Sequence, residues 1–136
     1  VDVPVYPNGH SQAYQVNVEA IGKKITPQTI LVVGSLPGFP QGICDPIESI
    51  SDLLEKKDPD GYIGLHVDSC LGGFVIPFMR QAGFDDGPER FGFDVKRVSS
   101  ISADTHKYGG DEKGSSLILF RDENWKRHLV YVDKDW

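Results

Sequence analysis

The segment HVDSC, residues 66–70, places polar and nucleophilic side chains directly behind an apolar run. Because successive residues of a strand point to opposite faces, a strand here would put His66, Asp68 and Cys70 on one face. An imidazole, a carboxylate and a thiol together carry more polar chemistry than an ordinary core contains. The pattern therefore indicates a site that holds a ligand or a cofactor.

A second segment, DTHKYGGDEKG at 104–114, combines basic side chains with glycines. Lys107 follows His106 directly, and Lys113 lies in the glycine-rich turn beyond it. A lysine ammonium offers a point charge to an anion, and a neutral lysine amine attacks an electrophile such as an aldehyde. This segment indicates that the ligand is anionic or electrophilic.

One chemistry uses both segments, namely that of pyridoxal 5'-phosphate (PLP). This cofactor needs a lysine whose amine forms a Schiff base with its aldehyde, and a carboxylate that keeps its ring nitrogen protonated. Lys107 and Asp68 supply these two groups. Because Lys107 follows a buried, strand-like run, we expect it to be shielded from solvent. We therefore predict PLP as the cofactor and no metal.

Two other interpretations stay open at this point. The side chains of His66, Asp68, Cys70 and His106 are donors that zinc accepts, although the paired spacings typical of zinc sites are absent. Taken singly, Asp68 is also explained as a cap at a strand end, and His66 as a hydrogen-bonded residue beside it.

The apolar patterns predict strands that alternate with helices. Strands are expected at 1–6, 29–34, 62–67, 97–103 and 115–120. A short helix is expected after Asn17, which can cap it, and another over 71–83, kinked or delayed by Pro77 and closed by Gly83.

The helix expected at 45–57 has the clearest signals. Asp45 reads as its N-cap, Pro46 as a first-turn proline and Glu48 as a first-turn acid. Its apolar stripe consists of Ile47, Ile50, Leu53 and Leu54. Two lysines at positions 56 and 57 suit the negative end of the helix dipole.

This order of elements predicts an α/β domain with a mainly parallel sheet and flanking helices, with strands apolar on both faces. Ligands of such sheets bind at the carboxyl ends of the strands. Residues 68–70 and 104–107 each follow a predicted strand. We expect both groups to face the same crevice.

Composition limits the function further. The 136 residues are 39% hydrophobic, which is sufficient for one domain with a packed core. The net charge of −6, with scattered basic residues, argues against binding to nucleic acid or to an anionic membrane. Two cysteines, Cys44 and Cys70, cannot form a disulfide framework, which favours a reducing compartment.

Several longer stretches resemble the sphingosine-1-phosphate lyases, which are group II PLP-dependent decarboxylases of fold type I. The matching stretches are PGFPQGICDPI at 37–47, LHVDSCLGGFVIPFMRQAGF at 65–84, FDVKRVSSISADTHKYG at 93–109, KGSSLILF at 113–120 and VDKDW at 132–136. The resemblance covers nearly the whole chain and is weakest in residues 1–25.

The resemblance implies roles for five residues. Lys107 is the Schiff-base lysine, and Asp68 pairs with the ring nitrogen of PLP. Cys70 packs on one face of the ring, where many relatives have alanine. His106 lies near the cofactor phosphate, and Lys113 belongs to a turn at the substrate end of the site.

The chain also departs from the family pattern. The lyases usually have an aromatic residue and Ala-Pro before the KGSS turn, whereas this chain has Gly110, Asp111 and Glu112, and two acids weaken the attraction of Lys113 for an anion. The family's phosphate-cradling loop and ring-stacking histidine lie upstream. We therefore expect residues 1–136 to be part of a single PLP-binding large domain, with an N-terminal segment and a C-terminal small domain outside the chain.

The implied activity is that of an aldehyde-lyase, which splits a phosphorylated sphingoid base into a long-chain aldehyde and phosphoethanolamine. One alternative is a PLP-dependent decarboxylase of glutamate or an aromatic amino acid. An alternative of another class is a non-catalytic fragment that binds a partner or a metal. The resemblance further implies a homodimer in the intact parent, membrane contact only through a segment outside this chain, and no activity of the 136 residues alone.

Overall fold

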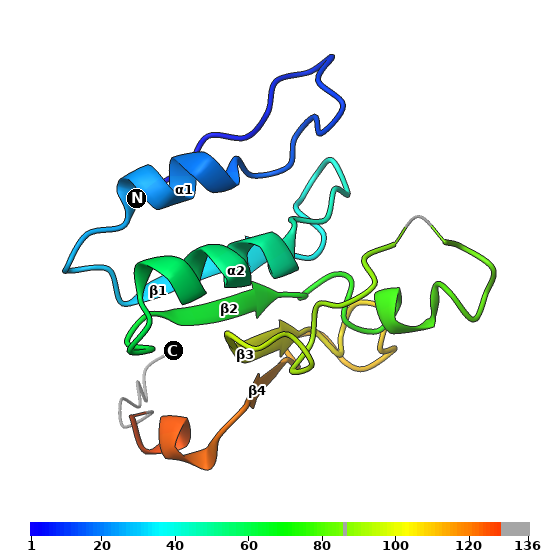
Figure 1. Cartoon of the computed structure of the whole chain (residues 1–136). Coiled ribbons are helices and arrows are strands. Elements are labelled where there is room, and N and C mark those ends of the chain that lie inside the picture. Colours follow the sequence, from blue (N-terminus) through cyan, green and yellow to red (C-terminus); the bar gives the residue numbers. More distant parts are fainter. Residues whose placement is uncertain (86, 129–136) are drawn as a thin grey trace.

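A four-stranded sheet organises the chain, of which the computed structural model describes residues 1–85 and 87–128 (Figure 1). Its strands, in spatial order, are β1 Leu31–Ser35, β2 Gly64–Asp68, β3 Val98–Ala103 and β4 Leu117–Phe120. The first three run parallel, and β4 is antiparallel to β3. The predicted mainly parallel sheet is confirmed.

Helices flank this sheet. Figure 1 shows α2 (Ile47–Lys57) lying across β1 and β2, with α1 (Val18–Lys24) beside it. Two short 3-10 helices, η1 (Ile76–Phe78) and η2 (Glu123–His128), complete the elements. Asn17 caps α1 as predicted, because its Oδ1 accepts the Ala20 N–H at 3.0 Å. No helix among the described residues has the length and apolar character needed to span a bilayer.

The core lies between α2 and the sheet. The predicted stripe of α2 is confirmed, since Ile47, Ile50 and Leu54 are buried and Leu53 is partly buried. Burial of each large aliphatic side chain stabilises the fold by about 1.5–3 kcal/mol. Gly34 of β1 allows the close approach of α2, because a Cβ there would lie 2.6 Å from Ile47 Cδ1.

The opposite face of the sheet is different. It carries His66 and Asp68 of β2, which register with Ser100 and Ser102 of β3. We call these four residues the polar face. Because of this polar face, the expectation of strands apolar on both faces is wrong for β2 and β3; on the same side Val33 of β1 is apolar and 51% exposed.

Two predicted elements are much reduced in the structure. Residues 1–6 form only an isolated bridge between Val5 and Val16, because prolines at 4 and 7 lack the N–H that a ladder requires. The helix predicted over 71–83 shrinks to η1 within a series of turns. Gly72, Gly73 and Pro77 disfavour a longer helix in this segment.

Asp45 does not cap α2, contrary to the prediction. Its Oδ1 accepts the Val16 N–H at 2.9 Å, and its Oδ2 accepts the Ser35 N–H at 2.8 Å. The carboxylate therefore joins the N-terminal segment to the end of β1. The predicted end of α2 at the two lysines is confirmed.

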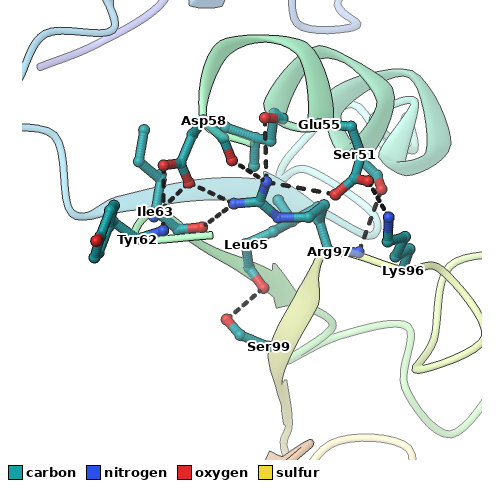
Figure 2. Close-up of polar contacts among 10 residues, drawn as sticks. Ser51, Glu55, Asp58, Tyr62, Ile63, Leu65, Lys96, Arg97 and Ser99 are labelled. Atoms are coloured by element: carbon teal, nitrogen blue, oxygen red, sulfur yellow. Dashed lines mark hydrogen bonds and ion pairs between the residues drawn. The ribbon is translucent and has the colours of Figure 1, made fainter. Parts of the chain in front are cut away.

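Arg97, which precedes β3, joins the end of α2 to the start of β2 through hydrogen bonds (Figure 2). Its guanidinium pairs with Asp58 Oδ2 at 2.6 Å and also donates to the Asp58 carbonyl at 2.7 Å. Further bonds reach the carbonyls of Ile63 at 2.9 Å and Leu54 at 3.1 Å. Since the Arg97 side chain is only 8% exposed, this network is part of the core.

Candidate active site

The two polar segments come together where β2 and β3 end. Asp68, the last residue of β2, registers with Ser102 of β3. Beyond the strands, the Ser69 N–H donates to the Ser102 carbonyl at 3.0 Å and the Asp104 N–H to the Cys70 carbonyl at 3.2 Å. The structure therefore places residues 68–70 and 104–107 at one edge of the sheet, as the parallel order requires.

Asp68 is an ionised, partly buried acceptor. Its Oδ1 accepts the Cys70 backbone N–H and the Ser102 hydroxyl, each at 3.0 Å. Burial raises the pKa of Asp68, but the hydrogen bonds that it accepts from Cys70 and Ser102 outweigh this effect, so the net shift of the pKa is downward. A negative charge is thus maintained at the carboxyl end of β2.

Lys107 makes an ion pair within its own turn. Its Nζ lies 2.8 Å from Asp104 Oδ2. The hydrogen bond that Lys107 donates to Asp104 raises the pKa of Lys107, and Cys70 adds to this effect. The Lys107 side chain is 33% exposed, so the expectation of a shielded lysine is wrong for this structure, in which the edge of the sheet is open.

His106 is oriented by the turn that follows it. Its Nδ1 lies 2.6 Å from the Ser115 carbonyl oxygen, which can only accept, so Nδ1 carries the proton. The Nε2 atom lies 4.0 Å from Asp104 Oδ2. The backbone N–H of His106 also donates to the Ser115 carbonyl at 3.4 Å, which brings the turn back toward the lysine.

Lys113 is exposed in that turn. Gly114 beside it adopts a φ of +93°, a conformation that favours glycine. Within the described residues Lys113 makes no ion pair with Asp111 or Glu112. Asp111 instead accepts hydrogen bonds from the Ser115 hydroxyl and the Glu112 N–H, each at 2.9 Å.

The zinc interpretation gains no support. The predicted donors were His66, Asp68, Cys70 and His106, but the part of the chain that the structure describes contains no group of three or more metal-binding side chains. Both nitrogens of His66 contact serines instead, Ser100 at 2.8 Å and Ser102 at 3.2 Å.

Sequence reasoning missed several polar residues of this edge. They are Ser100, Ser102, Ser115 and Ser116, the last of which donates to Asp104 Oδ1 at 2.6 Å. The alternation of Ser100 and Ser102 was the available signal, because it places both hydroxyls on the face that carries His66.

A groove of about 730 Å³ lies beside this edge, between the start of α2 and the turns after β2. Cys44, Ile76, Met79, Arg90 and Tyr108 are among its lining residues. Burial, followed by the charge of Asp45, raises the pKa of Cys44, so this thiol stays protonated. The groove includes Tyr108 but neither Asp68 nor Lys107.

Known proteins resemble the chain over most of its length. A model of the pyridoxal-dependent decarboxylase conserved domain matches residues 3–136. A sphingosine-1-phosphate lyase of Drosophila melanogaster is 48% identical over 125 residues, which cover 92% of this chain and 22% of the relative. The corresponding lyase of Saccharomyces cerevisiae is 46% identical over 90% of this chain and 20% of the relative. The chain thus spans about a fifth of the length of these relatives.

Solved structures have the same arrangement. A sphingosine-1-phosphate lyase from Burkholderia pseudomallei has a TM-score of 0.79 and 38% identity, over 90% of this chain and 27% of that chain. A glutamate decarboxylase from Lactobacillus brevis has a TM-score of 0.69 and 26% identity, over 82% of this chain and 24% of that chain.

Proposed function

The chain belongs to the pyridoxal-dependent decarboxylase family, and from this we propose that the intact protein is a PLP-dependent aldehyde-lyase. Its substrate is a phosphorylated sphingoid base, and its products are a long-chain aldehyde and phosphoethanolamine. Family membership and the solved relatives confirm the predicted fold type I arrangement, of which residues 1–136 form a part. The family also implies PLP as the cofactor.

Similarity favours the lyase over the decarboxylase alternative. Sphingosine-1-phosphate lyases from animals, yeast, plants and bacteria match the chain at 41–48% identity. The solved glutamate decarboxylase is 26% identical, against 38% for the solved lyase. The observation that carries the proposal is this similarity, together with Asp68 and Lys107 at one edge of the sheet.

The residues at this edge fit PLP. Asp68 is a carboxylate that stays ionised despite partial burial, as a partner for a protonated ring nitrogen must be. Lys107 lies on the neighbouring turn, where its amine forms an ion pair with Asp104. A carboxylate and a lysine at adjacent strand ends are the donor set that the cofactor requires.

When bound, PLP supplies an aldehyde that condenses with amines and a protonated ring that accepts electrons from the carbon–carbon bond being broken. In this proposal Lys107 holds the aldehyde covalently, and Asp68 keeps the proton on the ring nitrogen. Cys70 packs against the ring, and His106 faces the cofactor phosphate. Lys113 attracts the substrate phosphate, and its exposed ammonium supports this role.

Assembly is part of the same proposal. Resemblance to fold type I enzymes supports a homodimer of the intact protein, with any membrane contact made through a segment outside these residues. Sedimentation of the intact protein tests the dimer, and a monomer at micromolar concentration contradicts it.

The function is tested with the intact protein, PLP and two classes of substrate. We expect a phosphorylated sphingoid base to give long-chain aldehyde and phosphoethanolamine in equal amounts. Carbon dioxide from glutamate or an aromatic amino acid, without aldehyde from the sphingoid base, would establish the decarboxylase instead.

A further inference from the structure

The polar face carries a continuous chain of hydrogen bonds that ends on Asp68. Ser100 Oγ lies 2.8 Å from His66 Nδ1, and His66 Nε2 lies 3.2 Å from Ser102 Oγ. Ser102 Oγ in turn lies 3.0 Å from Asp68 Oδ1. These hydrogen bonds cross between β2 and β3 three times, and the register of the two strands sets their geometry.

Counting protons fixes the direction of every bond. An ionised carboxylate only accepts, so the single hydroxyl proton of Ser102 points to Asp68. Ser102 Oγ must then accept from His66, which places a proton on Nε2. A neutral imidazole with Nε2 protonated has a bare Nδ1, so Ser100 donates its hydroxyl proton there.

The environment keeps this histidine neutral. Burial lowers the pKa of His66, and the charge of Asp68 opposes the effect only in part. Ser100 is 8% exposed, so the far end of the chain is closed to solvent. Each donor polarises the next when bonds align in this way, which strengthens the last bond onto the carboxylate.

We propose that Ser100, His66 and Ser102 form a relay that orients Asp68 and stabilises its charge, so that His66 and Ser102 are positioning residues of the site. The relay rests on the proposed function only for the identity of the group that Asp68 faces. The Cys70 N–H and the Ser102 hydroxyl both donate to Asp68 Oδ1. The other carboxylate oxygen of Asp68, Oδ2, is therefore the one that would accept from the ring nitrogen of the cofactor.

The first test is the tautomer of His66 in the intact, cofactor-free protein. Histidine labelled with 15N and observed by NMR should show Nε2 protonated and Nδ1 bare. The tautomer is measured in the protein without substitutions, so the test does not require a variant to fold. A proton on Nδ1, or an imidazolium at neutral pH, overturns the relay.

The second test follows the Asp68 carboxyl carbon by NMR titration of the cofactor-free protein. Ser102→Ala should shift the titration of Asp68 upward, and Ser102→Thr, which keeps the hydroxyl, should restore it. Ser99→Ala is the matched control, since Ser99 is a buried serine of β3 that donates to the Leu65 carbonyl at 3.0 Å instead. An unchanged Asp68 titration in a folded Ser102→Ala variant contradicts the proposal.

Cofactor binding gives a readout that separates this inference from the proposed function. With PLP labelled at its ring nitrogen, Ser102→Ala should lower the protonated fraction and weaken PLP affinity by about tenfold, as for loss of one charge-assisted hydrogen bond. If the His66 tautomer and the Asp68 shift are found but no lyase activity is, the relay stands and the function fails. If the enzyme cleaves its substrate while Ser102→Ala leaves the ring nitrogen unchanged, the relay fails.

Discussion

The two ends of the β2–β3 pair use similar residue types for different purposes. At the amino end, Arg97 and Asp58 are nearly buried, and backbone carbonyls and N–H groups make further hydrogen bonds to both side chains. At the carboxyl end, Lys107 is one-third exposed and pairs with Asp104 of its own turn, and Asp68 is partly buried.

The Arg97–Asp58 ion pair therefore has the features of a structural pair, whereas the Lys107–Asp104 pair is accessible to a ligand. The guanidinium of Arg97 bonds to the end of α2, to its C-cap Asp58 and to the residue before β2, so it has little freedom to meet a ligand (Figure 2). The amine of Lys107 contacts one carboxylate and can exchange that partner for another. We therefore expect substitutions at the amino end to change stability, and substitutions at the carboxyl end to change cofactor chemistry.

Arg97→Ala should have the largest effect of the variants considered, on stability. Removing one partner of a buried pair costs about 3–5 kcal/mol, because the remaining carboxylate is left without compensation. Urea unfolding of the intact protein measures the change. Arg90→Ala is the control, since Arg90 makes an exposed pair with Glu48 and should cost about 0–1 kcal/mol. Equal losses of unfolding free energy in Arg97→Ala and Arg90→Ala would show that the buried pair is no more important for stability than the exposed one.

Asp68→Asn should keep the fold and lose turnover. Removal of a preorganised charge in an active site raises the barrier by roughly 3 kcal/mol, so we expect kcat to fall by on the order of a hundredfold. Steady-state kinetics of the intact protein measure kcat, and urea unfolding shows whether stability is retained. A variant with near-normal kcat would show that Asp68 does not serve the chemistry.

The Asp58 pair should make stability sensitive to acid. The Ile63 N–H, together with Arg97 and Tyr62, lowers the pKa of Asp58 despite the opposing effect of burial. Because the folded pKa is below the unfolded one, the stabilisation is complete above about pH 4 and is lost as pH falls through the folded pKa. Asp58→Asn should reduce this dependence in unfolding measured from pH 6 downward. A variant with an unaltered acid profile would assign the sensitivity to other carboxylates.

Lys113→Ala should have the smallest effect, confined to substrate recognition. An exposed ammonium contributes about 1 kcal/mol to binding a phosphate, so KM for the phosphorylated base should rise by about fivefold. KM for the unphosphorylated base should not change. Lys96→Ala is a control, because Lys96 is an exposed lysine paired with Glu55 at the amino end. Equal changes with both substrates would remove phosphate recognition from Lys113.

Local patterns predicted the elements that depend on neighbouring residues alone. The stripe of α2 and the strand face shared by His66 and Asp68 follow from periods of 3.6 and 2. The Asn17 cap and the end of α2 follow from local residue types. The prediction for Asp45 failed because its carboxylate bonds to N–H groups from two distant segments.

The polar partners at the carboxyl edge could not be predicted in the same way. Ser100 and Ser102 are ordinary strand residues by sequence, and only the register of β3 against β2 brings them to His66. The predicted site residues lie at one edge because parallel strands end together, whereas their hydrogen bonds depend on tertiary packing. The stretch VDKDW at 132–136 lies outside the described residues.

We propose that the carboxyl edge of the sheet binds the cofactor and that Lys107 is the nucleophile of this site. Borohydride reduction of the intact protein with PLP, followed by mass spectrometry of the peptides, tests it directly. We predict a pyridoxyl group on Lys107, and no such label at any site in a folded Lys107→Ala variant. A label on Lys113 or another lysine, with none on Lys107, would contradict the account.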